Sequence, residues 1–499
     1  MYLGFDCSTQ GLSAVVIDTA SRRVVFRDAI HFDSELPQFG TVHGVLHSDI
    51  PGVVHAPPLM WKAALQTMFK RLAASGIDVA RIRAISGSAQ QHGSVYCGET
   101  METLTRSTAP VWMDSSTERE CAEIEASLGG PQAVAQLTGS RAYPRFTGPQ
   151  IRKFAGEHPQ AYSATSHIHL VSSYLASLLI GAHAPVDHAD ASGMNLMDIR
   201  AHAWSDAALA ATAPDLARKL PLLVPSATII GTLGPNWHQP FGFRPAAVVA
   251  WSGDNPCSLV GTGLLGEGEL TVSLGTSDTI FGPMLEPRIS ADGTGHVFAS
   301  PAGGYMGITV FSNGSLARER VRDQSGFEWN RFSEALRTTE AGNAGAMMLP
   351  WFEPEITPHV ANGGPHYFGL ENANAASHIR AVIEAQMTAL SRHSAWMGVT
   401  PRRIHATGGG AANADILQVM ADVFDADVQQ CDATDSAALG AALRAYQAHS
   451  GASWPEVMDG FTRRAPASLI RPIASHVAIY RRLRSIYAAR EQAALGTRT

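Results

Sequence analysis

The feature that most constrains the fold is a strand–turn–strand unit that occurs twice along the chain. The first copy, residues 2–18, reads YLGFDCSTQG followed by LSAVVID, and the second, residues 269–281, reads ELTVSLGTSDTIF. Alternating β-branched runs that flank a short polar turn predict a β-hairpin, and FDCSTQG is similar to SLGTSDT. We therefore predict two related halves, each with a turn whose backbone N–H groups and hydroxyls can hold an anion.

A second stretch, residues 248–261, places a carboxylate next to one of these turns. It reads VVAWSGDNPCSLVG, which predicts a short buried strand, a Ser-Gly turn and then a helix. Asp254 stands at the expected helix N-cap with Pro256 in the first turn. Capping is the commonest role of an Asp at this place, but a carboxylate close to an anion-holding turn is also what moving a phosphoryl group onto an alcohol requires.

Bulk composition excludes several classes of protein. A chain of 499 residues with 45% hydrophobic and 16% charged residues predicts a globular protein of two or more domains. The net charge of −7 without a basic cluster argues against nucleic-acid binding. Five dispersed cysteines without a CxxC pair support neither a disulfide framework nor a zinc finger, and favour a cytoplasmic location. Asp6 interrupts any signal peptide, and no apolar run approaches the ~20 residues of a membrane span.

Further along the chain, predicted strands and helices alternate, which is typical of an α/β protein. Helices are predicted over residues 59–74, 116–128, 170–179, 377–397, 414–424 and 436–446, and strands over residues 82–87, 404–407 and from 427. Residues 31–58 are predicted as a loop. Residues 220–244 are rich in Pro and Gly without a sustained period, so we predict a domain boundary there, between domains 1–244 and 245–499.

Taken together, eight segments resemble the FGGY family of carbohydrate kinases. They span residues 5–428 and read FDCSTQG, SGSAQQHGSVY, PVWMDSST, TGSRAYPRFTG, SGDNPCSLVG, VSLGTSDTIF, FSNGSLARE and ATGGGAANADILQVMADVFDADV. The resemblance implies two similar domains of the actin and hexokinase ATPase type, with ribonuclease H-like cores and a cleft between them. The N-terminal domain would bind sugar and carry the first phosphate loop. The C-terminal domain would carry the catalytic Asp, the second phosphate loop and the site of the nucleotide base.

The implied activity is transfer of the γ-phosphoryl group of ATP to the C5 hydroxyl of a ketopentose, with D-xylulose the expected acceptor and D-xylulose 5-phosphate the product. A sugar hydroxyl is a poor nucleophile near neutral pH and needs a carboxylate as general base, a role that the resemblance gives to Asp254. Positions that match the family's sugar site are His92, Arg145, Asp254 and Asn255. Without the resemblance, His92 reads as a structural loop histidine and Arg145 as half of a surface ion pair.

ATP and Mg²⁺ are the implied cofactors. Asp6 would face the phosphates and Mg²⁺ through water, since Mg²⁺ keeps several waters. The other positions that match the family's nucleotide site are Thr9, Gln10, Thr276, Ser277, Trp329, Gly408, Gly409 and Asn413. Trp329 could equally be a core aromatic on a helix face. The chain lacks the GxxxxGK[ST] motif, which excludes a P-loop kinase.

Other readings stay open at this point. Another ketopentose or related sugar of the same family could be the acceptor. From a different class, the chain could be an actin-like or heat-shock-like ATPase without sugar chemistry, or a catalytically inactive sugar sensor. GTGLLG at residues 261–266 spells GxGxxG but follows a predicted helix, so we interpret it as a helix-ending turn. We expect small-molecule partners only, in a monomer or homodimer, and assign no role to residues 468–499 beyond a solvated helix face.

Overall fold

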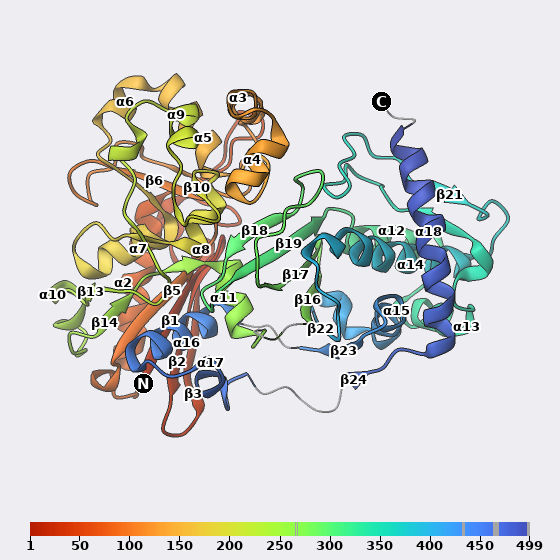
Figure 1. Ribbon diagram of the computed structural model, residues 1–499. Coiled ribbons are helices and arrows are strands. Elements are labelled where there is room, and N and C mark those ends of the chain that lie inside the picture. The colour runs from red at the N-terminus through yellow and green to blue at the C-terminus, as the bar shows by residue number, and fades with distance from the viewer. Residues whose placement is uncertain (265, 267, 432–434, 463–468, 497–499) are drawn as a thin grey trace.

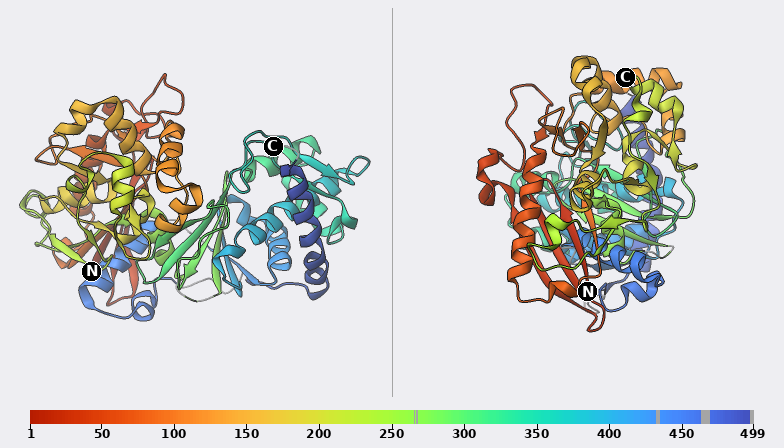
Figure 2. Two further views of the ribbon diagram at one scale, coloured as in Figure 1. Left: turned by 45° about the horizontal axis from the view of Figure 1, so that its top comes forward. Right: turned by 90° about the vertical axis from the view of Figure 1, so that its left-hand side faces the viewer.

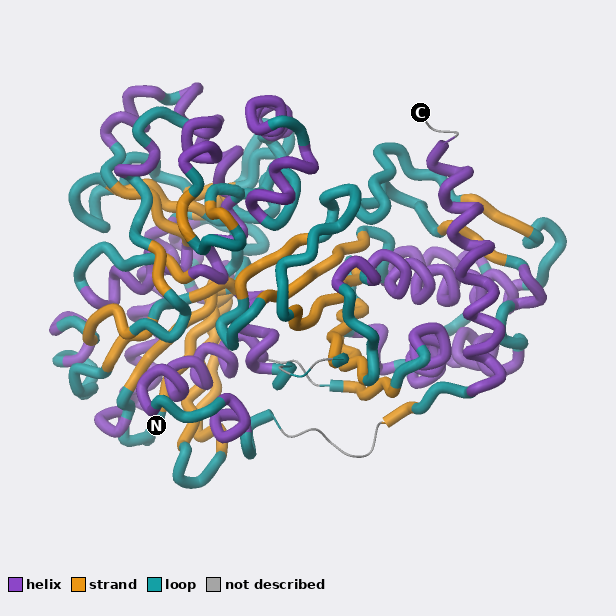
Figure 3. The backbone as a smooth tube through the Cα atoms, in the orientation of Figure 1, coloured by secondary structure: helices purple, strands orange, loops and turns teal. Residues whose placement is uncertain are grey.

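Two mixed sheets form the centres of two domains in the computed structural model, which describes residues 1–264, 266, 268–431, 435–462 and 469–496 (Figure 1, Figure 3). Within these residues the first sheet has the order β13–β14–β5–β1–β2–β3, with β15 beside β5. Its strands are β1 (Tyr2–Cys7), β2 (Gly11–Asp18), β3 (Arg23–His31), β5 (Ala84–Ala89), β13 (Ile229–Thr232), β14 (Ala247–Val249) and β15 (Ser252–Gly253). The second sheet has the order β18–β19–β17–β16–β22–β23–β24. Its strands are β16 (Glu269–Leu274), β17 (Asp278–Met284), β18 (His296–Ala299), β19 (Tyr305–Phe311), β22 (Arg403–Thr407), β23 (Asp427–Gln430) and β24 (Leu469–Ile470).

The two sheets repeat one topology, which confirms the predicted duplication. In the first, β1, β2 and β3 are antiparallel neighbours, while β5 lies parallel to β1 and β14 parallel to β5. In the second, β16, β17 and β19 are the antiparallel neighbours, and β22 and β23 follow in parallel. The order β3–β2–β1–β5–β14 therefore corresponds to β19–β17–β16–β22–β23. In each sheet, the predicted hairpin supplies the first two strands in chain order.

Helices cover both sheets. Leu65, Met68 and Phe69 of α2 (Pro58–Ala74) are fully buried against the first sheet, as the helical spacing of apolar residues predicts. Phe5 stacks between Phe69 and Trp251 at ring distances of 5.7 and 5.8 Å, and burying such a side chain stabilises the fold by about 1.5–3 kcal/mol. The helix α7 (Val171–Ile180) packs into the same core. In the second domain the core helices are α14 (Ala375–His393), α15 (Ala414–Phe424) and α18 (Ala474–Gly496).

A helical lobe stands above the first sheet, at the upper left of Figure 1. Its helices are α3 (Glu118–Leu128), α4 (Pro131–Thr138), α5 (Thr147–Glu157), α6 (Pro159–Ala164) and α9 (Asp206–Thr212). Its core includes Met284, Val297 and Met397 from the second domain. The lobe is thus one part of the first domain that packs on the second.

The domain boundary predicted between residues 244 and 245 is wrong. β14, which follows this point, pairs with β13 and β5 in the first sheet, and α16 (Ser436–Ser450) packs on the same sheet from much further along the chain. Both views in Figure 2 show red and blue segments together in the first domain. The Pro- and Gly-rich composition of residues 220–244 marks an irregular connection inside the first domain. Local composition gives no sign that residues 436–450 also belong to this domain.

Smaller differences concern helix ends and one loop. Ser252–Gly253 is the short strand β15, and α11 (Asp254–Gly261) begins at Asp254 with Gly253 as its N-cap, one residue earlier than predicted. The helix ends at Gly261, as predicted for GTGLLG, of which Leu265 lies outside the described residues. The predicted loop 31–58 contains the short helix α1 (Phe32–Glu35). No helix among the described residues is both long and apolar enough to cross a membrane.

Two glycines let α11 and α16 cross at close range, which yields a prediction. A Cβ added at Gly440 would lie 1.9 Å from the carbonyl oxygen of Cys257, a backbone atom that cannot move aside cheaply. We expect Gly440→Ala to destabilise the protein by about 3 kcal/mol despite the better helix propensity of alanine. Gly156→Ala is the matched control, since nothing lies within 4 Å of its added Cβ on α5, and it should stabilise by about 0.5–1 kcal/mol. Thermal unfolding followed by circular dichroism distinguishes them, and equal melting temperatures for Gly440→Ala and the wild type would refute the crossing.

Candidate active site

Asp6 and Asp254 open onto one cavity of about 440 Å³, which we call the acidic cavity. Its wall also includes Gln10, Asn255 and Asp435. The two acids meet because β1 and β15 both run parallel to β5, with Asp6 and Ser252 each opposite Ser88. Parallel strands place their carboxyl ends at one edge of the sheet, where ligand sites form in α/β folds. Asp254 therefore belongs to the first domain, not to the second as its sequence position suggested.

The acidic cavity holds its two carboxyl groups in a half-buried environment, where they repel each other. Burial, together with the charge of Asp6, raises the pKa of Asp254 to about 7. Burial also raises the pKa of Asp6 to about 6, with a smaller contribution from Asp435. The backbone N–H of Asn255 donates to Oδ1 of Asp254 at 2.7 Å and holds its orientation. A carboxyl group with a pKa near 7 suits a general base that works near neutral pH.

The turn between β1 and β2 borders this cavity. Its backbone is closed by the N–H of Ser8, which donates to Gly11 O at 2.9 Å. Gln10 lies in the cavity wall, whereas the hydroxyl of Thr9 accepts a hydrogen bond from the indole of Trp112 at 2.8 Å. The structure thus brings Gln10 to Asp6 and Asp254, and places the Thr9 hydroxyl against Trp112, while Thr9 is not among the lining residues of the cavity.

The predicted sugar residues connect to the acidic cavity through a chain of contacts. The side-chain amide of Asn255 donates to Oε1 of Gln91 at 2.9 Å, and His92 follows Gln91 in the loop after β5. His92 has a left-handed backbone, with φ 71°, and its carbonyl accepts from the Thr147 hydroxyl at 2.9 Å. A non-glycine residue in this region is strained, and such strain gathers at functional sites.

His92 and Arg145 lie beside the same aromatic ring. The imidazole of His92 stacks on Phe146 with ring centroids 4.3 Å apart, and Arg145 lies 5.8 Å from the centroid of that ring. Burial and the positive charge of Arg145 lower the pKa of His92 to about 3, so His92 is a neutral hydrogen-bonding group at physiological pH. Within the part of the chain that the structure describes, Arg145 has no carboxylate partner. Its guanidinium donates to Nε2 of His296 at 2.9 Å, across the domain interface.

A second cavity of about 900 Å³ lies in the second domain, and we call it the second-domain cavity. It is bordered by the turn after β16 and by the segment after β22, which are the equivalents of the first-domain edge. The predicted residues Thr276, Trp329, Gly409 and Asn413 line it. Ser277 is exposed next to Thr276, and Gly408 lies behind Gly409 with φ 83°. A Cβ on Gly408 would approach Leu274 O within 2.7 Å, so this turn requires glycine.

Two features shape the second-domain cavity. Arg318 of α12 (Ser315–Gln324) binds both carboxylate oxygens of Asp278 at 2.7 and 3.0 Å and donates to Gly275 O at 3.3 Å, which fixes the turn. Trp329 opens α13 (Trp329–Thr338) and is 41% exposed, with the Arg322 guanidinium 4.6 Å from its ring. Trp329 is therefore not the core aromatic of the alternative reading. Asn413 N-caps α15, and its amide donates to Ser333 at 2.8 Å.

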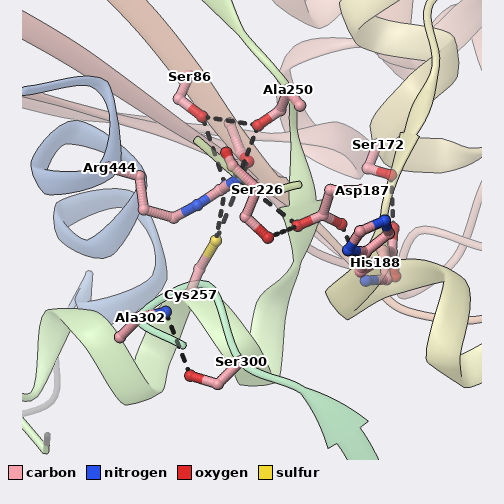
Figure 4. Close-up of polar contacts among 12 residues, drawn as sticks. Ser86, Ser172, Asp187, His188, Ser226, Ala250, Cys257, Ser300, Ala302 and Arg444 are labelled. Carbon is pink, nitrogen blue, oxygen red and sulfur yellow. Dashed lines mark hydrogen bonds and ion pairs between the residues drawn. The ribbon is translucent and has the colours of Figure 1, made fainter. Parts of the chain in front are cut away.

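Arg444 reaches from α16 into the interior of the first domain (Figure 4). Its guanidinium donates to Ala250 O at 2.7 Å and Ser226 O at 2.9 Å, and lies 3.6 Å from the carboxylate of Asp187. Both charged side chains are buried, with exposed fractions of 2% and 0%. Because Ala250 directly follows β14 on the way to Asp254, this buried pair supports the segment that carries the predicted base.

Sequence reasoning missed three residues near the site. Arg444 has a weak signal, a lone charge within the Ala-rich run SAALGAALRAYQ. Arg318 lies in FSNGSLARE, a segment that resembled the family, but nothing in the sequence distinguishes it from Arg320 or Arg322. His296 has no local signal, since only the docking of β18 on the lobe brings it to Arg145.

The fold and the site together define the class of protein. The two domains share one topology, and each has a polar turn at the edge of its sheet. Paired acids lie beside a polar cluster whose groups suit hydroxyls. This combination is typical of a sugar-phosphorylating enzyme. The chain belongs to the FGGY family of carbohydrate kinases: residues 1–261 match the family's N-terminal domain and residues 270–449 its C-terminal domain. This membership confirms the resemblance, and it does not favour an actin-like or heat-shock-like ATPase.

Known relatives cover nearly the whole chain. A xylulose kinase of Mus musculus is 42% identical over 529 aligned positions, which cover 99% of this chain and 94% of the relative. Xylulose kinase 2 of Arabidopsis thaliana is 40% identical, with 89% and 86% covered. Among solved structures, a ligand-bound xylulose kinase from Lactobacillus acidophilus superposes with a TM-score of 0.86 at 19% identity, covering 98% of this chain and 97% of that one. At this identity the structural match supports the fold alone.

Proposed function

We propose that this carbohydrate kinase phosphorylates D-xylulose at its C5 hydroxyl with ATP, giving D-xylulose 5-phosphate and ADP. The observation that carries the proposal is the joint position of Asp254 and Asp6 in the acidic cavity, linked through Asn255 and Gln91 to His92. The choice of ketose rests on the relatives named xylulose kinases, which match over nearly the full chain.

In the proposed reaction Asp254 is the general base. It accepts the proton of the C5 hydroxyl as that oxygen attacks the γ-phosphorus, so the new O–P bond forms while the bond between the γ-phosphorus and the β–γ bridging oxygen breaks and ADP leaves. The neutral imidazole of His92, the guanidinium of Arg145 and the amide of Asn255 orient the sugar. A site built from such directed groups rejects analogues that lack a matching hydroxyl.

The turns supply the contacts to the phosphates. Backbone N–H groups and hydroxyls at Thr9, Gln10, Thr276 and Ser277 would hold the phosphate chain, and Trp329, Gly408, Gly409 and Asn413 would border the nucleoside. Asp6 fits a magnesium role through water, because its Oδ1 is buried and has no hydrogen-bond partner among the described residues. When bound, Mg²⁺ would neutralise charge on the phosphates.

Among the described residues, the acidic cavity and the second-domain cavity have no lining residue in common. A phosphoryl group held by the second turn therefore meets the sugar only if the domains approach each other. Such closure would also exclude water from Asp254 and limit ATP hydrolysis without sugar.

A panel of ketoses tests the proposed substrate. ADP release is measured with D-xylulose, its C3 epimer D-ribulose, its C4 epimer L-ribulose and L-xylulose, and ³¹P NMR identifies the phosphorylated position. We expect the highest kcat/KM with D-xylulose and a 5-phosphate product. A clear preference for another ketose would reassign the substrate, and equal ADP release without any sugar would reject the kinase reaction.

The raised pKa of Asp254 predicts how the sugar kinase activity depends on pH. Because the base must be deprotonated and its pKa is raised to about 7, kcat/KM for the sugar should fall about tenfold per pH unit below this value and level off above it. The profile is recorded from pH 5.5 to 9 at saturating Mg-ATP. A flat profile between pH 6 and 8 would contradict the assigned base.

A cytoplasmic location and a monomeric or homodimeric state remain predictions. The free state of the five cysteines fits a reducing compartment. Light scattering coupled to size-exclusion chromatography measures the oligomeric state directly.

A further inference from the structure

His296 is the first residue of β18 in the second domain, yet it lies at the sugar residues of the first. Two backbone N–H groups of β18 bond to the first domain: Val297 N–H donates to Gly139 O at 3.0 Å, and Ala299 N–H donates to the Ser192 hydroxyl at 2.9 Å. His296 is 2% exposed. Its position is therefore determined by both domains.

The contact with Arg145 decides which ring nitrogen of His296 carries the proton. A guanidinium has only donors, so Nε2 of His296 accepts the 2.9 Å hydrogen bond from Arg145. Burial and the charge of Arg145 lower the pKa of His296 well below its usual range, which keeps the ring neutral. The single ring proton is then on Nδ1.

This Nδ1–H donor has no hydrogen-bond partner within the described part of the chain, although the atom is buried. Buried donors are nearly always paired, and a bound ligand can supply the missing acceptor. The neighbouring His92 is complementary. Its Nδ1 donates to Gly193 O at 2.8 Å, which leaves its Nε2 as an acceptor. Phe146 contacts both imidazoles, at centroid distances of 4.3 and 5.5 Å.

We propose that His296 is a sugar-positioning residue supplied by the second domain: its Nε2 orients Arg145, and its Nδ1–H donates to an oxygen of the bound ketose. This rests on the proposed function, because the acceptor is an oxygen of the sugar substrate. It gives the second domain a direct part in sugar recognition, in addition to its contacts with the nucleotide.

Two near-isosteric variants separate the roles of the two ring nitrogens. In His296→Gln the amide reaches the place of Nε2 and can accept from Arg145, but nothing donates at the place of Nδ1. In His296→Asn the amide donates at the place of Nδ1, but Arg145 loses its acceptor. Calorimetric titration with D-xylulose in the absence of ATP, followed by kcat and KM for both substrates, measures each loss.

We expect His296→Gln to weaken D-xylulose binding about tenfold, His296→Asn to weaken it less than His296→Ala, and all three to leave the KM for ATP unchanged. Repeating the titration with 1-deoxy-D-xylulose and the C3 and C4 epimers identifies the acceptor, since its removal or inversion costs affinity in the wild type and not in His296→Gln. His169→Gln is the matched control, because His169 is equally buried but bonded to Ser173 and His183.

Wild-type affinity in His296→Gln would overturn the inference. So would an equal loss of ATP and sugar affinity with a lowered melting temperature, which would make the role purely structural. If the wild-type enzyme prefers another ketose, the proposed substrate fails separately, and the same variants titrated with that ketose still decide the role of His296.

Discussion

Replacing Asp254 with asparagine is expected to lower kcat about 10³-fold, which corresponds to about 4 kcal/mol of transition-state stabilisation. The amide keeps the size of the side chain but cannot accept the proton of the attacking hydroxyl. Sugar affinity should change little or increase, because the pKa of Asp254 is raised by burial and by Asp6, and the variant removes that repulsion. The loss should therefore appear in kcat and not in KM.

Single-turnover assays with pre-bound D-xylulose measure this effect without interference from product release. Asp49→Asn is the matched control, since it makes the same charge change at a carboxylate with a side chain that is 96% exposed, and it should retain full activity. The residual activity of Asp254→Asn should also lose the rise of rate through pH 7. If Asp254→Asn keeps more than a tenth of wild-type kcat with both substrates bound, Asp254 is not the base.

The fold was largely predictable because its signal is local. Each half opens with a hairpin whose alternating residues and polar turn lie within about twenty positions, and both hairpins form as predicted at β1–β2 and β16–β17. The domain boundary was not predictable in this way. Residues 436–450 return to the first sheet from the far end of the chain. Gly4, Gly261 and Gly440 permit the close approach of α16, but this role of the three glycines is recognisable only in the folded structure.

The candidate site likewise contains residues with a local sequence signal and residues without one. Asp6 lies near the end of β1, and Gln10, His92, Asp254 and Asn255 come shortly after β1, β5 or β15, so the parallel pairing of these strands gathers them at one edge of the sheet. Arg145 lies in an irregular segment of the helical lobe, and its sugar role came from the resemblance alone. His296 and Arg444 act through packing between segments about 150 and 190 positions from Arg145 and Asp254, and no local pattern encodes such contacts.

Arg444→Met is expected to have the largest effect on stability. It removes the only basic partner that the described residues give to the buried carboxylate of Asp187. It also removes the Arg444 donor from Ser226 O and from Ala250 O, which keeps the weaker 3.2 Å hydrogen bond from the Ser86 hydroxyl. Breaking a buried ion pair on one side destabilises by about 3–5 kcal/mol, which for a domain of this size lowers the melting temperature by about 10 °C. Because Ala250 leads directly into β15 and Asp254, kcat should fall as well.

A comparison of variants separates the charge from the shape of the side chain. Arg444→Lys keeps a positive charge without the planar fork, so it should be destabilised less than Arg444→Met but still lose part of the contacts to the carbonyl groups. Adding Asp187→Asn to Arg444→Met removes the unpaired carboxylate and should restore part of the stability. Arg481→Met on α18 breaks an exposed pair with Asp425, 2.7 Å apart, and should change stability by about 0–1 kcal/mol. If Arg444→Met melts at the same temperature as Arg481→Met, the buried pair does not hold the segment that carries Asp254. The position of the base must then depend on β15 and α11 alone.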